Sequence, residues 1–571
     1  MKKRIHMAEH ISNRERERPR RMLALTVASA TLFAQVVGVS ASAAEPFERN
    51  ITDGPYIVEI SELEDTEVEQ NLVEDSDKEK AGKTAEKRKG EEKNMQLFYT
   101  PQHARVGDVI PYYEDGKFHL FYQKNWNPYF GSDRKDGWHL LNTKDMVHYG
   151  PETAIGILGG TGSVIKADGI YHLYYCVFEQ NPQRQYVCHA TSRDLDSWTK
   201  HEEETFGPDE TIYLPTDWRD PYVFWNEEEN CWWMLLCAQS QGKTGRRGCV
   251  GLCKSADLHH WECCEPLYAP HASMSAYECP DMFYENGWWY LIFSQFTDRF
   301  QTIYRMSRSC HGPWKRPKTD SFDGRAFYAA KSCGDGNHRY LFGWNPTRTQ
   351  NTWNFDPDPN HEGYDYKTYD WGGTLIPHEI YAREDGTLAV RPNPALKEVL
   401  TIQNDVKWAP MNGAWEIGET SAVVDTPYAY ASALSENDVP HQGCLALDFT
   451  FSEGTERFAV ALQVDEEFAR GYYFYLDPKR QRLEYKSAIR MHEQGGWTFQ
   501  YDVELERPLE LIPGKTYSME IYIDESVMEV YVGGTTALSV RAYDLHDRKF
   551  GLAVSDGKVR FENIQLTTMG G

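Results

Sequence analysis

Three acidic stretches recur at comparable places along the chain, and their residue types could do chemistry. They are Val-Gly-Asp-Val-Ile-Pro at 106–111, Trp-Arg-Asp-Pro at 218–221 and Tyr-Glu-Cys-Pro-Asp at 277–281. Each precedes a run rich in aromatic and β-branched residues, which is typical of a strand. Carboxylates that converge from equivalent strands repel one another and shift each other's pKa values. Such an arrangement suits acid–base and nucleophilic chemistry.

The runs that follow the acidic stretches belong to one repeat. Its five copies are DGKFHLFYQ (115–123), DGIYHLYYC (168–176), ENCWWMLLCA (229–238), NGWWYLIFSQ (286–295) and GNHRYLFGW (336–344). A second phrase, which predicts a turn and an outer strand, appears as NTKDMVHY (142–149), TSRDLDSW (191–198), KSADLHHW (254–261) and, degraded, SRSCHGPW (307–314). Periods of about 50–60 residues without a long helical pattern predict radial blades. We therefore predict an all-β chain with a five-bladed β-propeller over residues 95–400.

The innermost strand of each propeller blade lines the central channel, so residues at equivalent starts face one axial pocket. Asp108, Ser163, Asp220 and the stretch 278–281 occupy such starts. A single carboxylate there is usually a turn or solvated residue. Three acids at similar places favour a functional site instead. We take Asp108, Asp220 and Glu278 as candidate catalytic residues and Ser163 as a candidate substrate-binding residue.

Length and composition narrow the class of protein. A chain of 571 residues is too long for one ordinary core and predicts two domains plus extras. The 17 Trp and 35 Tyr suit an all-β protein with a stacking surface for a sugar-like ligand, although most such aromatics belong to the core. A net charge of −26 argues against nucleic acid or an anionic membrane as partner.

The N-terminus reads as an export signal. Residues 1–21 are basic, residues 22–40 are apolar and small, and Ala41-Ser42-Ala43 supplies a cleavage site. We predict a signal peptide over 1–44 and a secreted or cell-surface protein. An uncleaved membrane anchor is the alternative, because the apolar run is nearly long enough to span a bilayer. Residues 51–94 are dominated by Glu, Asp and Lys, and we predict a disordered charged spacer over 45–94.

The twelve cysteines are scattered through strand-like runs, which predicts buried free thiols rather than a disulfide framework. Pairs such as Cys249/Cys253 and Cys263/Cys264 lack histidines at zinc-finger spacing. We therefore expect neither a metal nor a cofactor. The blade repeat stops after Pro394, and short alternating runs such as CLALDFTF (444–451) predict a β-sandwich over 401–571. This second domain is either a carbohydrate-binding module or, as we favour, a buttress for the propeller.

The order Asp, Arg-Asp-Pro, Glu-Cys-Pro-Asp over five blades resembles glycoside hydrolase family 32, the β-fructosidases (invertases, inulinases and levanases). The supporting phrases are FHLFYQKNWNPYFG (118–131), WHLLNTKDMVHY (138–149), RDPYVFW (219–225), ECPDMFYENGWWYLIFSQ (278–295) and WGGTLIPHEIYAREDGTLAVRPNPAL (371–396). Two motifs differ. The family's Asn-Asp-Pro-Asn-Gly is replaced by Gly-Asp-Val-Ile-Pro at 107–111, and its Trp-Gly-His is reduced to Trp138-His139.

The resemblance implies hydrolysis of terminal β-D-fructofuranosyl residues in sucrose, fructo-oligosaccharides or fructans, with retention of configuration. Asp108 would be the nucleophile and Glu278 the general acid and later base. Asp220 and Arg219 would hold the ring hydroxyls and stabilise the transition state. Trp126 and Trp138 are predicted either to line the sugar pocket or to belong to the core, and Gln123 to hydrogen-bond there.

Other functions remain open at this point. An inverting arabinosidase or xylosidase on a five-bladed propeller would hold its two carboxyl groups about 6.5–9.5 Å apart, against about 5–5.5 Å for retention. A fructosyltransferase would intercept the covalent intermediate with a sugar instead of water. A catalytically inactive sugar-binding propeller would have no need of a proton donor, so Glu278 argues against it. The oligomeric state is left open.

Overall fold

The computed structural model describes residues 95–127, 137–349, 363–487 and 503–570. The predicted signal peptide (1–44) and spacer (45–94) lie outside these residues. Within them, no helix is long and apolar enough to cross a membrane. The α-helix that the figure labels, α3 (Ala395–Val399), follows the last propeller strand.

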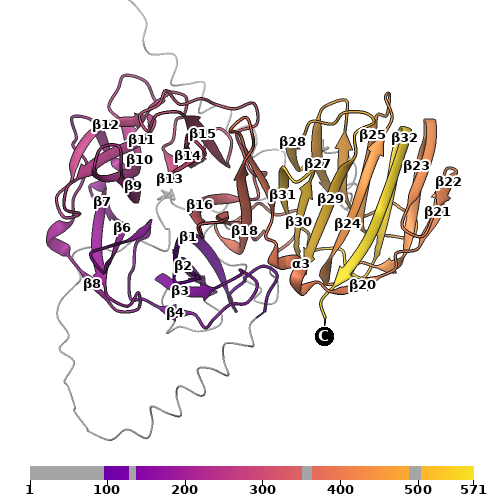
Figure 1. Ribbon diagram of the computed structural model, residues 1–571, viewed down its shortest axis with the longest axis horizontal. Coiled ribbons are helices and arrows are strands. Elements are labelled where there is room, and N and C mark those ends of the chain that lie inside the picture. Colours follow the sequence, from indigo (N-terminus) through magenta and orange to yellow (C-terminus); the bar gives the residue numbers. More distant parts are fainter. Residues whose placement is uncertain (1–94, 128–136, 350–362, 488–502, 571) are drawn as a thin grey trace, which may run out of the picture. The chain divides into compact units, whose positions relative to one another are not determined.

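Five antiparallel groups of strands form the blades of a propeller around a common axis (Figure 1). Blade 1 consists of β1 (Ala104–Glu114), β2 (Lys117–Trp126), β3 (Gly137–Thr143) and β4 (Thr153–Ala154). Blade 2 consists of β5 (Gly160–Ala167), β6 (Ile170–Gln180), β7 (Gln183–Ser192) and β8 (Trp198–Lys200), followed by the 3₁₀ turn η2 (Glu202–Glu204). Blade 3 consists of β9 (Tyr213–Asn226), β10 (Cys231–Ser240), β11 (Gly248–Ser255) and β12 (Glu262–Tyr268). Blade 4 contains β13 (Tyr277–Glu285), β14 (Trp288–Gln295) and β15 (Gln301–Ser307), and blade 5 contains β16 (Tyr328–Gly334), β17 (Arg339–Pro346), β18 (Gly373–Ala382) and β19 (Leu388–Pro392).

The repeat found in the sequence is the second strand of each blade with the turn before it. The first copy shows why it begins with Asp-Gly. Asp115 and Gly116 have φ of 50° and 75°, as the tight turn between β1 and β2 requires. The second phrase is the turn after the third strand. In it the Asp145 carboxylate accepts hydrogen bonds from the amides of Val147 and His148 at 3.0 and 2.8 Å.

The innermost strand of every blade carries a β-bulge at the same place. The bulged pairs, each facing a single residue of the second strand, are Gly107–Asp108, Thr161–Gly162, Asp220–Pro221, Cys279–Pro280 and Ala329–Ala330. In blades 3, 4 and 5 the first residue of the pair has φ of 56°, 49° and 53°. A bulge twists its strand and turns a side chain away from the alternation of the pleat. The five bulges lie where the strands enter the axial channel.

The C-terminal strands form a β-sandwich. They are β20 (Ile402–Asn404), β21 (Trp408–Asn412), β22 (Trp415–Ile417), β23 (Ala422–Asp438), β24 (Gln442–Phe451), β25 (Arg457–Val464), β26 (Tyr472–Asp477), β27 (Arg482–Ser487), β28 (Leu505–Pro508), β29 (Tyr517–Asp524), β30 (Val527–Val532), β31 (Thr536–Arg541) and β32 (Lys549–Thr568). The long strand β32 serves both layers, because its first half pairs with β25 and its second half with β24. Alternate side chains of both layers fill the core between them. This agrees with the predicted fold class.

Blade 5 and the sandwich meet through buried polar groups. The imidazole of His378 on β18 lies 2.9 Å from Asp323 and 2.8 Å from the hydroxyl of Tyr531 on β30. The backbone amide of Ser539 on β31 donates to Asp323 at 2.8 Å. Asn345 on β17 donates to Glu529 on β30 at 3.1 Å. This face of the sandwich is covered, as the buttress interpretation expects.

All twelve cysteines lie in the described residues and are free thiols, eight of them buried. The prediction of buried free thiols is therefore confirmed for most of them. The Cys253 and Cys263 sulfur atoms face each other on neighbouring strands at 3.6 Å.

Candidate active site

The three predicted carboxylates, Asp108, Asp220 and Glu278, line one cavity of about 640 Å³ at the axial ends of the inner strands. That volume lies in the range usual for small-molecule sites. The acids come from blades 1, 3 and 4, so residues separated by more than a hundred positions meet only because the blades are radial.

The bulges explain how different residues of three inner strands reach the same cavity. Asp108 is the second residue of its bulge, Asp220 is the first of its own, and Glu278 immediately precedes the bulge of β13. Asp220 adopts a left-handed φ of 56°, which non-glycine residues adopt only at a local cost. The acids are thus one residue out of step with each other in the repeat.

Asp108 is the acid with the most perturbed environment. Burial raises its pKa to about 7, and the negative charges of Asp220 and Glu278 add to the effect. The hydrogen bond that the Trp344 indole donates to its Oδ1 at 3.3 Å acts in the opposite direction. A carboxylic acid whose pKa is held near 7 by burial and like charge fits a chemical role better than a structural one.

Glu278 is gripped from two sides. The Arg219 guanidinium donates to its Oε1 at 2.8 Å, and the Tyr328 hydroxyl donates to its Oε2 at 2.6 Å. Both contacts favour the ionised form, yet burial outweighs them and, with the charge of Asp220, raises the pKa of Glu278 above its usual range. Its carboxyl is oriented and also inclined to carry a proton, which is what a general acid requires.

Asp220 is held by backbone and flanked by Arg219. The amide of Cys279 donates to its Oδ2 at 2.9 Å. Arg219 is shared, since it also binds Asp217 at 2.7 Å and its Nε lies 4.0 Å from Asp220. Neighbouring acids raise the pKa of Arg219 well above its usual range despite burial, so it stays charged.

Aromatic side chains form the remaining wall of the cavity. The rings of Phe300 and Tyr328 stack at 4.3 Å, and the half-exposed Phe296 lies beside Phe300 at 5.6 Å. Trp371 packs directly over Gly107, where a Cβ atom would lie 2.2 Å from its ring. Gly107 therefore allows Trp371 to approach the bulge that carries Asp108. Flat apolar faces beside carboxylates are a usual setting for sugar rings.

The family follows from comparison with known proteins. The model of the glycosyl hydrolases family 32 N-terminal domain matches residues 109–364, and that of the family 32 C-terminal domain matches residues 419–568. The chain belongs to glycoside hydrolase family 32. It is accordingly a glycoside hydrolase, as the resemblance in the sequence predicts.

Relatives of this family 32 enzyme match it over most of its length. Sucrose-6-phosphate hydrolase of Escherichia coli is 23% identical over 497 residues, covering 80% of this chain and 90% of the relative. Levanbiose-producing levanase of Bacillus subtilis (strain 168) is 24% identical over 533 residues, covering 85% and 92%. The solved structure of exo-inulinase from Aspergillus awamori shares the fold with a TM-score of 0.60 and 18% identity, over 84% of this chain and 98% of that one.

The other predicted site residues of the family 32 enzyme are divided. Arg219 and Gln123 line the cavity, with the Gln123 amide donating to the carbonyl of Gly159 at 2.6 Å. Ser163 lies outside it, because its hydroxyl accepts from the Val223 amide at 2.9 Å and braces blade 2 against blade 3. Neither Trp126 nor Trp138 is among the residues that line it. Trp138 is 1% exposed within the core of blades 1 and 2, and Trp126 lies under the ammonium of Lys124 at 3.7 Å.

Several cavity residues were not identified from the sequence. Tyr328 stands at the position that Arg219 and Glu278 occupy in their own blades, directly before the bulge. Aligning the blades by their bulges, rather than by the second strand, would have pointed to it. Trp344 ends the fifth copy of the repeat, and Trp371 lies in the last supporting phrase of the resemblance. Both residues stand in phrases quoted from the sequence, but neither is acidic, so the comparison of acidic stretches did not select them.

The described residues that are grouped well enough to bind a metal lie outside the cavity. They are His189, Glu204 and His259; His201, Glu203 and Glu204; and Asp323, His378 and Glu529.

Proposed function

We propose that this glycoside hydrolase cleaves terminal β-D-fructofuranosyl residues by a retaining double displacement. The observation that supports it most is the convergence of Asp108, Asp220 and Glu278 in one cavity of a family 32 propeller. The relatives named for levanase and sucrose-6-phosphate hydrolase activities point to the same class of substrate.

Asp108 acts as the nucleophile. Its carboxylate attacks the anomeric carbon of the fructosyl unit while Glu278 transfers its proton to the departing glycosidic oxygen. The C–O bond to the leaving group breaks as the ester to Asp108 forms. Water then attacks the same carbon, gives its proton to Glu278 and releases Asp108 as a carboxylate, so both groups return to their initial states.

Asp220 and Arg219 position the sugar. Asp220 is fixed by the Cys279 amide at 2.9 Å, which leaves its second oxygen to accept from ring hydroxyls. Arg219 stays cationic and touches Glu278 at 2.8 Å. Its positive charge stabilises the carboxylate that Glu278 becomes after giving up its proton. The hydrogen bond from Tyr328 stabilises the same carboxylate.

The charge of the cavity favours an uncharged fructoside over a phosphorylated one. Among its described lining residues, Arg219 is the only cation, against the acids Asp108, Asp220, Glu278 and Asp370. Arg219 is already bound to Asp217 and Glu278. Among these described residues, a phosphate dianion would meet like charge and no free cation to offset it. Sucrose, fructo-oligosaccharides and fructans are therefore proposed ahead of sucrose 6-phosphate.

Incubation with sucrose, sucrose 6-phosphate, inulin, levan and aryl arabinosides, followed by identification of the released sugar, tests this function. Free fructose from the neutral fructosides is expected. With methanol present, retention yields methyl β-fructofuranoside, whereas an inverting enzyme yields no such transfer product. Release of arabinose alone would favour the arabinosidase alternative. Transfer of fructose to a second sugar, with little free fructose, would favour a fructosyltransferase. No cleavage at all would favour a sugar-binding propeller.

The export signal leads to a separate proposal on location. We expect a secreted or cell-surface enzyme whose mature chain begins near Ala44, because basic, apolar and Ala-Ser-Ala regions follow in order. N-terminal sequencing of the native protein tests it. Retention of residues 22–43 would favour the membrane anchor.

A further inference from the structure

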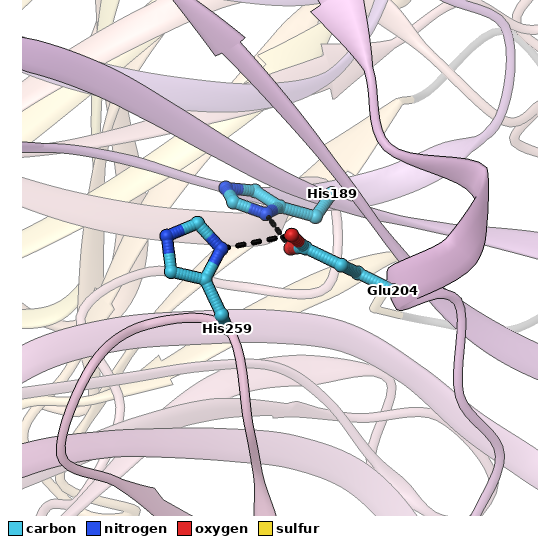
Figure 2. A group of neighbouring side chains, drawn as sticks. All are labelled: His189, Glu204 and His259. Atoms are coloured by element: carbon cyan, nitrogen blue, oxygen red, sulfur yellow. Dashed lines mark hydrogen bonds and ion pairs between the residues drawn. The ribbon is translucent and has the colours of Figure 1, made fainter.

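Outside the cavity, a cluster of histidines and glutamates joins blade 2 to blade 3. Figure 2 shows the side chains of His189, Glu204 and His259 pointing at one another. His189 lies on β7, Glu204 on η2, and His259 on the turn between β11 and β12. The His189 Nδ1 lies 2.5 Å from Glu204 Oε2, and the His259 Nδ1 lies 2.8 Å from Glu204 Oε1.

The arrangement of these atoms suits a small divalent ion. One ligand atom from each of the three residues lies within 4.8 Å of the others. Around a tetrahedral zinc with bonds of about 2.0–2.2 Å, ligand atoms stand about 3.3 Å apart. The two glutamate contacts need to open by less than about 1 Å to admit the ion. Imidazole and carboxylate are ligands that zinc accepts, and imidazole also suits copper and nickel.

The inner side of the cluster has the support that metal-binding histidines need. The His189 Nε2 lies 3.0 Å from His172 Nδ1, and the rings of His172 and Tyr174 stack on His189 at 5.1 and 4.5 Å. When Nδ1 binds a metal, Nε2 must carry the proton and needs an acceptor. His172 supplies one. Without a metal, the same atoms reverse their roles, so that His172 donates to His189 and His189 donates to Glu204.

The cluster is also reachable from solvent. The His189 side chain is 2% exposed, but Glu204 is 19% and His259 is 44% exposed. The buried group of Asp323, His378 and Glu529 lacks such access, and hydrogen bonds to Tyr531, Ser539 and Asn345 already occupy its atoms. Of the two places, only the first leaves an ion a way in.

The backbone amide of His259 donates to Asp257 of its own turn at 2.9 Å, but its ring does not bond there, although the ring of its neighbour does. In the equivalent turn of blade 1 the His148 ring lies 2.8 Å from Asp145, and in blade 3 the His260 ring lies 2.8 Å from Asp257. His260 is therefore the turn residue. His259, one position earlier, faces away from its turn and reaches Glu204 of blade 2.

We propose that His189, Glu204 and His259 bind a divalent transition metal, Zn²⁺ foremost, and that the ion ties the β11–β12 turn of blade 3 to η2 of blade 2. Water completes the coordination. His201 and Glu203 lie close by and form a second group of possible ligands with the same Glu204. The site is structural. It shares no residue with the cavity of Asp108 and Glu278.

The test compares two substitutions on one turn. His259→Gln removes a ligand, and His260→Gln changes an adjacent histidine that is 90% exposed and whose ring lies against Asp257 of its own turn. The full chain is stripped with a chelator, equilibrated with Zn²⁺ alone, and analysed for bound metal and for its melting temperature. Co²⁺ replaces Zn²⁺ in a parallel experiment, because its absorption spectrum distinguishes imidazole and carboxylate ligands from thiolates.

The wild type and H260Q are expected to bind one Zn²⁺ per chain and to melt several degrees higher with it. H259Q should bind Zn²⁺ at least about tenfold more weakly, because even the loss of a residue that only hydrogen-bonds to a metal ligand weakens binding by about that much. It should also lose most of the rise in melting temperature. Turnover should be equal in all three, with or without chelator. Equal zinc binding by H259Q and H260Q, a thiolate spectrum with Co²⁺, or no stoichiometric binding by the wild type would each overturn the proposal.

Discussion

Two groups of acids in this molecule meet opposite conditions. In the axial cavity, Asp108 has the Trp344 indole as a hydrogen-bond donor at 3.3 Å and lies close enough to Asp220 and Glu278 to feel their charge. Where blade 5 meets the sandwich, Asp323 accepts from the amides of Gly324 and Ser539, from the Ser539 hydroxyl and from His378.

The pKa values move in opposite directions although burial acts on both. Burial raises the pKa of Asp108 to about 7, whereas the hydrogen bonds and charge of His378 and the donors of Ser539 hold the pKa of Asp323 below its usual range. Donors around a buried carboxylate thus make it a structural anion. A carboxylate left with few donors beside other acids is costly for folding and available for chemistry.

Glu529 shows the third condition, a buried acid that stays neutral. Burial and the charge of Asp323 raise its pKa well above its usual range. The Ser539 hydroxyl lies 2.6 Å from Asp323 and 2.7 Å from Glu529, and it has one proton to donate. A protonated Glu529 donating to Ser539, which in turn donates to Asp323, satisfies all three groups. The two acids at this contact thus carry one negative charge, where sequence alone would count two.

The largest expected effect is at Asp108. Asp108→Asn keeps the size of the side chain and removes the nucleophile, so turnover on sucrose or levan should fall about a thousandfold or more. Steady-state kinetics with an intact melting transition as the folding control measure it. Retention of more than about a tenth of wild-type turnover would show that Asp108 is not the nucleophile.

A smaller, substrate-dependent loss is expected at Glu278. Glu278→Gln should slow cleavage of a natural fructoside by about 10²–10⁴-fold, the usual contribution of a general acid. An aryl fructoside, whose leaving group needs little protonation, should lose much less. Kinetic measurements on both substrates decide between the roles, and equal losses would deny Glu278 the acid function.

The pH profile offers a second readout of the same residue. In the wild type, kcat/KM should fall on the alkaline side as Glu278 ionises, and on the acidic side, below about pH 7, as Asp108 takes up a proton. The Glu278→Gln variant should keep the acidic limb of the profile and lose the alkaline one. An alkaline limb that survives in Glu278→Gln belongs to another group.

Sequence reasoning succeeded where the signal repeats and failed where it does not. The five copies of the repeat predicted the second strands and, through the propeller geometry, placed Asp108, Asp220 and Glu278 in one pocket, and the family resemblance then assigned their roles. The bulges were not predictable, because Gly107–Asp108 and Ala329–Ala330 share no residue type. Tyr328 was missed for that reason. The position of Trp138 after the repeat of blade 1 was compatible with a pocket residue. Its side chain instead packs in the core between blades 1 and 2.

The histidine cluster lay beyond sequence reasoning for a different reason. His189, Glu204 and His259 come from two blades and have no spacing typical of a metal motif. The sequence gives no sign that His259, rather than His260, leaves the turn. Only the packing of blade 3 against blade 2 brings these side chains together.

Stability should depend on Asp323, which lies where blade 5 meets the sandwich. Asp323→Asn replaces a charge that four donors surround, and leaves His378 without its carboxylate at a fully buried position. Breaking one partner of such a network typically costs about 3–5 kcal/mol, which lowers the melting temperature by about 5–8 °C in a domain of about 300 residues such as the propeller. Calorimetry measures it. A change of less than about 2 °C would place Asp323 outside the network that holds the two domains.

In the cavity, the same kind of change should stabilise the fold. The folded pKa of Asp108, about 7, lies above its unfolded value, so its favourable contribution is complete below about pH 4 and is lost as pH rises through 7. At pH 8 the ionised Asp108 therefore opposes folding, by up to about 4 kcal/mol for a shift of about three pKa units. Asp108→Asn should melt several degrees higher than the wild type at pH 8 and equally at pH 4. A lower melting temperature at pH 8 would mean that the cavity satisfies this carboxylate.

The smallest effect is expected at Glu529, which is the matched partner of the Asp323 experiment. If Glu529 is protonated, Glu529→Gln keeps an acceptor for Asn345 and a donor for the Ser539 hydroxyl, which lie at 3.1 and 2.7 Å. The cost should then stay below about 1 kcal/mol near pH 7, the net worth of a single altered hydrogen bond. The side chain is fully buried, as Asp323 is, so burial alone cannot separate the two results. An ionised Glu529 would predict the opposite, because its loss would remove a charge that Asn345 and Ser539 stabilise. A melting shift for Glu529→Gln as large as that for Asp323→Asn would therefore replace the picture of one shared charge at this contact with one of two.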